Sequence, residues 1–292
     1  MPSKPEKDAV TGVETTGHEW DGIKELNNPL PSWWVWTFYV CIAFSVVWFI
    51  LFPAIPFGPS ATTGLTGNTA RERVANEIQA AADARAGINQ RIVEADLDTI
   101  RGDPDLFTYA LTGGEILFGD NCAPCHGVGG AGQLNYPVLA DDAWIWGGTL
   151  DAIQQTILYG VRNQEYEFDA RFSMMPRYGT DQLLTREEID QVANYVVTLS
   201  GRAPEDPALA EAGSEIYAQQ CASCHGAGGE GMAALGAPNL TDAIWLYGGE
   251  LGDIRQQIWN PQHGVMPGWV DRIAPAEIKM VSLYVHSLGG WQ

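Results

Sequence analysis

The chain has 292 residues, with 16 Lys or Arg against 36 Asp or Glu, so its formal net charge is -20. This acidity argues against nucleic acid as a partner, because phosphate binding needs a basic surface. With 46% hydrophobic and 18% charged residues, the chain is too apolar to remain disordered. It must bury a core, and its length allows one to three domains.

A membrane-spanning helix is predicted near the N-terminus. No charged residue lies between Glu25 and Arg71, and residues 33–52 are apolar apart from one Thr and one Ser. A helix of this length covers about 30 Å, the thickness of the hydrocarbon layer of a bilayer. Aromatic residues gather at both ends of the run, as they do at membrane interfaces. The preceding segment is acidic and no A-x-A site follows, so we interpret the run as an uncleaved anchor rather than a signal peptide.

Three segments therefore precede the rest of the chain. We predict a tail at residues 1–32, a transmembrane anchor at 33–57 and a helical linker at 58–105. In the linker, apolar side chains recur at helical spacing from Val74 to Ile92. The linker helices either pack on the following domain as a stalk or remain solvated.

The chain then repeats itself. Residues 114–127 align without a gap on residues 213–226, and each copy ends in a helix-like segment with an equivalent Tyr. The first copy carries an acidic, aromatic insertion around residues 165–172. Such self-similarity predicts two homologous domains, at residues 106–202 and 203–292.

Both copies contain the motif C-x-x-C-H followed by Gly. Its residues are Cys122, Cys125 and His126 in the first copy, and Cys221, Cys224 and His225 in the second. This motif is the attachment signature of haem c, in which two thiols form thioethers with the porphyrin and the His binds iron. Two disulfides, a redox C-x-x-C pair or a zinc site are the alternatives. They do not account for a His and a downstream Met in both copies, so we predict two covalently bound haem c groups.

A Met-Pro pair lies downstream in each copy. Because the pair is matched in the two copies, we predict Met175 and Met266 as the second axial ligands. A thioether is a soft ligand, so a high reduction potential is expected for both irons. The competing candidates are Met174 at the first site and His263 at the second. We assign each Met to the haem of its own repeat, although two similar neighbouring domains also permit an exchange.

At this point the repeat resembles the class I cytochrome c domain. Pro137 and Pro238 follow the motif histidines by 11 and 13 residues. In that family a Pro at this position gives its carbonyl to the second nitrogen of the axial His and so holds the ring. The resemblance implies that these prolines orient His126 and His225.

The same resemblance implies a crossing of the first and last helices within each domain. Each motif is preceded by a Gly and an aromatic residue that would permit close contact. We expect Phe118 to pack against Tyr195, and Tyr217 against Tyr284.

Over nearly its full length the chain resembles the dihaem subunit, subunit III, of cbb3-type cytochrome c oxidases. The resemblance rests on the order of acidic tail, N-P-L-P-x-W-W at residues 28–34, single span, helical linker and two haem motifs. It implies a mainly α protein with one N-terminal transmembrane helix, a helical linker and two tandem class I cytochrome c domains.

The resemblance also implies function and partners. The chain would accept electrons from a soluble cytochrome c and pass them to a monohaem cytochrome c subunit and a catalytic haem-copper subunit. It would not reduce oxygen by itself. The acidic surface either steers a basic donor or serves only solubility. The alternatives are an anchored dihaem peroxidase, a free-standing electron shuttle or the cytochrome subunit of a dehydrogenase.

The predicted location is a bacterial inner membrane, which the chain crosses once. Haem c is attached on the outer side of that membrane, so we expect both haem domains in the periplasm and residues 1–32 in the cytoplasm. The distribution of Lys and Arg around the span is a weak signal and leans slightly the other way.

Overall fold

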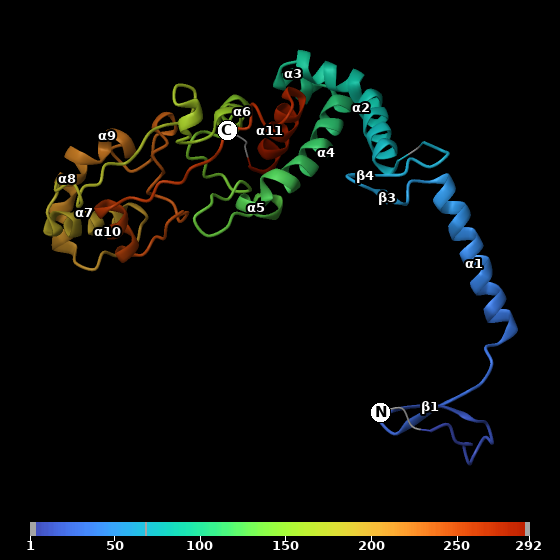
Figure 1. Cartoon of the computed structure of the whole chain (residues 1–292). Helices are drawn as coiled ribbons and strands as arrows, with labels where there is room; N and C mark the ends of the chain where they lie inside the picture. Colours follow the sequence, from blue (N-terminus) through green and yellow to red (C-terminus); the bar gives the residue numbers. More distant parts are fainter. Residues whose placement is uncertain (1–3, 68, 290–292) are drawn as a thin grey trace. The chain divides into compact units, whose positions relative to one another are not determined.

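The computed structural model describes residues 4–67 and 69–289 and divides the chain into two compact units, Met1–Ala84 and Arg85–Gln292. Residues 1–3 of the predicted tail and residues 290–292 of the predicted second haem domain lie outside the described residues. Figure 1 shows the elements in chain order.

The described residues are mostly helical, which confirms the predicted fold class. The helices are α1 (Ser32–Leu51), α2 (Ala70–Glu94), α3 (Leu97–Gly102), α4 (Pro104–Asn121), α5 (Ala123–His126), α6 (Leu150–Tyr159), α7 (Arg186–Leu199), α8 (Pro207–Gln220), α9 (Ala222–His225), α10 (Leu251–Trp259) and α11 (Pro275–Gly289). The 3-10 helices are η1 (Val128–Gly130), η2 (Gln164–Tyr166) and η3 (Ala233–Leu235). The strands are β1 (Thr15–Trp20), β2 (Ile23–Leu26), β3 (Pro56–Phe57) and β4 (Ser60–Ala61).

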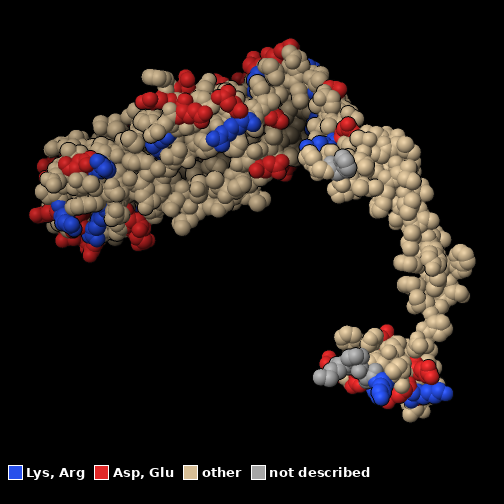
Figure 2. Space-filling model, in the orientation of Figure 1, with Lys and Arg blue, Asp and Glu red and all other residues tan. Residues whose placement is uncertain are grey.

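The first unit contains the apolar helix. Strands β1 and β2 form an antiparallel hairpin in which Trp20 lies opposite Ile23. Helix α1 follows Pro31 and ends before Pro53, since proline lacks the N–H that would continue the helix. Its surface carries no charge (Figure 2), and none of its side chains is buried. By length and composition α1 can cross a membrane. The rest of the predicted anchor leads into the short β3–β4 hairpin.

In the second unit the end of the linker packs on the domain that follows it. Ile92 and Ile100 are completely buried with residues of α4 and α11, and the Lys279 ammonium of α11 donates to the carbonyls of Val93 and Ala95 at 2.8 and 2.6 Å. This part of the linker is a stalk, one of the two predicted alternatives. Earlier in α2, the side chain of Val74 is exposed.

The helices of the second unit form two groups that exchange elements between the repeats. Helix α4 packs along α11 and α6 also contacts α11, whereas α8 packs along α7, which α10 covers (Figure 1). We call α4, α5, α6 and α11 the first module, and α7, α8, α9 and α10 the second module. Each module thus combines the attachment motif of one repeat with the last helix of the other.

The predicted aromatic pairs are therefore wrong. The ring centres of Phe118 and Tyr284 lie 5.4 Å apart, and those of Tyr217 and Tyr195 lie 5.2 Å apart. Both repeats carry a Gly and an aromatic residue at equivalent positions of the first helix and a Tyr in the last helix, so these residues do not distinguish the two pairings. The short connection at residues 200–206 decides, because it makes α7 and α8 antiparallel neighbours.

Glycine permits each crossing. A Cβ at Gly114 of α4 would lie 2.3 Å from the carbonyl oxygen of Met280, and one at Gly213 of α8 would lie 2.1 Å from that of Gln191. No side chain fits at these distances. The backbones of paired helices can therefore approach closely only where these two positions lack a side chain.

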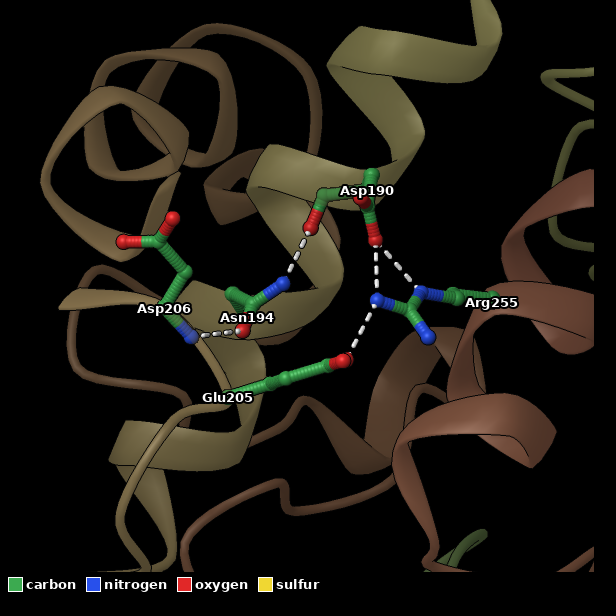
Figure 3. A network of polar contacts seen from close by, with 5 residues as sticks. All are labelled: Asp190, Asn194, Glu205, Asp206 and Arg255. Atoms are coloured by element: carbon green, nitrogen blue, oxygen red, sulfur yellow. Dashed lines mark hydrogen bonds and ion pairs between the residues drawn. The ribbon is translucent and has the colours of Figure 1, made fainter. Parts of the chain in front are cut away.

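A polar network ties the second module together (Figure 3). The Arg255 guanidinium of α10 contacts the carboxylates of Asp190, in α7, and Glu205, in the α7–α8 connection. The completely buried Asn194 amide donates to the Asp190 carbonyl at 2.9 Å and accepts from the Asp206 N–H at 3.2 Å. The connection is thus held against α7, and α10 against both.

Candidate functional site

Each attachment motif forms a tight turn at the end of a long helix. Helix α4 leads into the turn of α5, which a left-handed Gly127 ends; α8 leads into α9, which Gly226 ends in the same way. The first Cys of each motif is partly buried and the second is exposed. Both thiols of a motif therefore lie on one turn, as covalent attachment to a single porphyrin requires.

The motif histidines are held by proline carbonyls. His126 Nδ1 lies 3.2 Å from the carbonyl oxygen of Pro137, and His225 Nδ1 lies 3.0 Å from that of Pro238. A carbonyl only accepts, so Nδ1 is the donor and Nε2 keeps a free lone pair. Burial lowers the pKa of both imidazoles, while the proline carbonyl acts in the opposite direction. Neutral imidazoles with a directed Nε2 are what iron ligation requires.

The two methionines lie the other way round from our assignment. Met266, of the second repeat, packs with the first-module core together with Cys122 and Ala123. Met175, of the first repeat, packs with the second-module core together with Cys221 and Ala222. Each methionine thus packs against the same core as the attachment turn of the other repeat.

The competing ligands are placed differently. The Met174 side chain is 57% exposed, whereas Met175 is half-buried against the second-module core. His263 Nε2 accepts a hydrogen bond from the Met175 N–H at 3.0 Å. His263 therefore contacts the backbone of one methionine segment while belonging to the other.

The methionine exchange is accompanied by a direct backbone crossing. Val161 and Met266 exchange two N–H to carbonyl hydrogen bonds, both of 3.0 Å. A Cβ at Gly160 would lie 2.2 Å from the Met266 carbonyl oxygen, and Gly160 has a φ of +80°. Only glycine meets both demands, so this position permits the first repeat to run alongside the Met266 segment.

Two arginines of the second unit each have a buried side-chain nitrogen without a hydrogen-bond partner among the described residues. These atoms are Arg171 Nε and Arg202 Nη2. Their guanidinium carbons lie 5.8 Å from the ring centre of Trp146 and 5.7 Å from that of Trp245. A buried cationic donor without a partner is costly, so these atoms fit an anionic group. Haem c carries two propionates, and with the thiols and the directed histidines the residues present fit it. Neither arginine lies in a sequence motif, so no signal in the sequence points to either of them.

The state of the cysteines disfavours a redox pair, a zinc site and disulfides as alternatives to haem attachment. Burial raises the pKa of Cys122 and of Cys221 to about 11, so these thiols are neutral rather than reactive thiolates. The described residues contain no group of three or more His, Cys, Asp or Glu arranged to hold a metal ion. All five cysteines are free. A redox pair, a zinc site and structural disulfides are each less well supported than haem attachment.

Three family models match the chain in succession. Residues 12–59 match the N-terminal domain of cytochrome oxidase-cbb3, FixP; residues 111–200 match cytochrome c; and residues 208–285 match cytochrome c oxidase, cbb3-type, subunit III. The two cytochrome matches follow the sequence repeats, whereas the packing exchanges the last helices between them.

Curated relatives are similar over nearly their full length. The CcoP subunit of the cbb3-type cytochrome c oxidase of Cereibacter sphaeroides is 47% identical over 290 residues, which cover 99% of each chain. The FixP subunit of Azorhizobium caulinodans is 46% identical, covering 98% of this chain and 96% of its own. The CcoP subunit of Azospirillum brasilense is 44% identical, covering 99% of both.

Proposed function

Because this chain belongs to the family of cbb3-type cytochrome c oxidase subunit III, called CcoP or FixP in its relatives, we propose that it is the electron-entry subunit of such an oxidase. It is a cytochrome c subunit with a role in electron transport. In the proposal it accepts electrons from a soluble cytochrome c and passes them to a monohaem subunit and then to the catalytic haem-copper subunit, and it reduces no oxygen itself.

Two covalent haem c groups are part of the proposal. Cys122 and Cys125 would hold one, and Cys221 and Cys224 the other. When bound, haem c supplies a one-electron couple at iron. His126 and Met266 would hold the first-module iron, and His225 and Met175 the second-module iron. Pro137 and Pro238 would hold the histidine rings through Nδ1, and Arg171 and Arg202 would each meet a propionate.

One observation carries this function: the core that borders each attachment turn also packs a methionine, and the motif histidine beside it is held by a proline carbonyl. Two protein ligands per iron would leave no open position for oxygen or peroxide. This favours an electron-transfer protein over an enzyme that reduces either molecule. The peroxidase alternative needs one open position.

The partners and the orientation are proposed on charge and on haem chemistry. The acidic surface would steer a basic cytochrome c, and charge complementarity raises the association rate more than the affinity. Helix α1 would anchor the chain in the lipid of a bacterial inner membrane, with the haem modules periplasmic and the N-terminus cytoplasmic. It contains no Asp or Glu, so the proton pumping of the complex would take place in another subunit.

The test uses the full chain, purified gently from membranes. We expect two covalent haems per chain by pyridine haemochrome, reduction of both by a soluble cytochrome c, and copurification with a haem-copper protein. The variant Cys221→Ala/Cys224→Ala is the control and should hold one haem. One haem or none in the unaltered chain would refute the proposal. Rapid turnover of peroxide would favour the peroxidase, and isolation without a haem-copper partner would favour a shuttle or dehydrogenase subunit.

A further inference from the structure

We propose that Arg162 and His263 are positioning residues that couple the two axial methionines, so that the ligation of one haem depends on the order of the segment that serves the other. The proposal rests on the proposed function, because it takes Met175 and Met266 to be ligands. It concerns side chains that belong to neither haem motif.

Arg162 joins the two methionine segments through one guanidinium. Its Nε donates to the carbonyl of Gly264 at 2.7 Å, and its Nη1 donates to the carbonyl of Ser173 at 2.8 Å. Gly264 lies two residues before Met266, and Ser173 lies two residues before Met175. The guanidinium is a rigid planar fork, so the two bonds fix the segments relative to each other.

His263 supplies a second link, from the Met266 segment to the backbone of Met175. It lies three residues before Met266, yet its Nε2 accepts from the Met175 N–H at 3.0 Å. The segment that carries one methionine therefore holds the backbone of the other. Burial and the nearby charge of Arg162 lower the pKa of His263, which is consistent with a neutral ring that accepts at Nε2.

The position of Arg162 is itself determined by its surroundings. Its φ of +51° lies in the left-handed region, which is costly for a residue with a side chain. Its N–H donates to the Arg171 carbonyl at 2.6 Å, and the preceding Val161 pairs with Met266. On the far side of the crossing, the Gly264 N–H donates to the Tyr247 hydroxyl at 2.9 Å. A strained residue held from several sides is suited to fixing distances between its neighbours.

Coupling follows because these contacts lie close in sequence to the two methionines. Every bond that Arg162 or His263 makes across the crossing lies within three residues of a methionine. Releasing the guanidinium frees both segments at once, whereas an ordinary surface contact would affect one. A thioether must be placed accurately to remain on iron, because supporting contacts determine how well a ligand holds its position.

The test compares Arg162→Gln with Arg177→Gln in the full chain. Arg177 lies two residues after Met175 and pairs with Asp181 on the surface, so its variant controls for loss of a nearby cation. We measure haem content, the long-wavelength charge-transfer band of ferric His–Met haem, and the potentials of both haems. For Arg162→Gln we expect two haems, partial loss of the band at both and lower potentials for both. Arg177→Gln should match the unaltered chain.

His263 variants separate positioning from a merely structural role. His263→Leu removes the acceptor and should weaken the band of the haem attached through Cys221 and Cys224, whereas His263→Gln offers a carbonyl oxygen in its place and should restore most of it. Arg162→Lys keeps the charge without the fork and should be intermediate. If Arg162→Gln does not assemble, the two His263 variants decide.

Two results would overturn the coupling while leaving the function intact. One is a change at one haem only, or at neither, in an Arg162→Gln protein that holds two haems. The other is an equal loss in His263→Leu and His263→Gln. An unaltered chain that lacks two haems or the His–Met band refutes the proposed function instead.

Discussion

The first and second modules have similar attachment turns, but different polar contacts hold the last helix of each repeat. In the second module Arg255 ties α10 to Asp190 and to Glu205 (Figure 3). By the alignment of the repeats, the positions of Arg255 and Asp190 are occupied in the first module by Gln154 and Lys279, a pair with no opposite charges. Lys279 donates instead to carbonyls at the end of α2.

The aromatic position before the motif differs in the same way. The Tyr217 hydroxyl donates to the Gly226 carbonyl at 2.8 Å, whereas Phe118 in the first module has no hydroxyl to donate. Both rings are about equally buried. In both modules a proline carbonyl holds the motif His in the same way, whereas the polar contacts of the helices differ: Arg255 links helices within the second module, and Lys279 links the first module to the linker.

The largest expected effect comes from filling the two helix crossings. Gly114→Val should disrupt the first module and Gly213→Val the second, because the new side chain would overlap backbone atoms. We expect a loss of at least about 1–3 kcal/mol in each case, seen in thermal unfolding and in haem content. Gly119→Ala in α4 is the control, since its Cβ would meet nothing within 4 Å. A control as damaging as Gly114→Val would contradict this account of the crossings.

Exchanging the methionines for histidine should separate the modules by potential. In the Cys221→Ala/Cys224→Ala chain, which retains the first-module haem, Met266→His should lower the midpoint potential, because imidazole replaces a thioether. Met175→His should leave that potential unchanged. Potentiometric titration measures the midpoint potential of each variant. The opposite pattern would mean that each methionine serves its own repeat.

The linker contact is expected to matter next. Lys279→Met keeps an unbranched side chain but loses both bonds to the carbonyls of Val93 and Ala95. The loss should be about 1.5–3 kcal/mol, the range for hydrogen bonds to charged groups. Amide exchange of residues 88–102 should accelerate, as followed by mass spectrometry. Asp190→Asn at the equivalent position of the second module should leave that exchange unchanged. Acceleration in both variants would argue against a specific link.

Tyr217→Phe makes the second module resemble the first at one atom. It removes the bond to Gly226 and keeps the ring contact with Tyr195, so we expect a loss of about 0.5–1.5 kcal/mol in chemical denaturation. Tyr217→Ala also removes the ring and should cost about 3–5 kcal/mol. Equal losses would show that the hydroxyl, rather than the ring, dominates at this position.

The smallest effect is expected at the edge of the Arg255 network. Glu205→Gln removes an exposed ion pair and should cost at most about 1 kcal/mol, less at high salt. Asp190→Asn should cost more, since its carboxylate accepts from two nitrogens of Arg255. Denaturation midpoints at two salt concentrations provide the comparison. A larger loss for Glu205→Gln would reverse the order of the two contacts.

Sequence alone determined the features that depend on neighbouring residues. The apolar run of α1 and the two C-x-x-C-H motifs each lie within a short stretch of chain, so local spacing identifies them. The family resemblance implied that Pro137 and Pro238 hold His126 and His225, and the contacts of 3.2 and 3.0 Å agree with it. The family resemblance added the order of the domains and the oxidase, and the similar relatives support both.

Tertiary structure decided which repeat completes which module. Phe118 and Tyr217 offer nearly the same surface, as do Tyr195 and Tyr284, so either pairing buries similar apolar area and allows the same close approach. The choice lies in the connection between α7 and α8, which is too short to let these helices separate, and in the Gly160 crossing that carries Met266 to the other motif. Long-range contacts of this kind leave no periodicity or motif in the chain, which is why Arg162, Arg171 and Arg202 emerge only from the folded molecule.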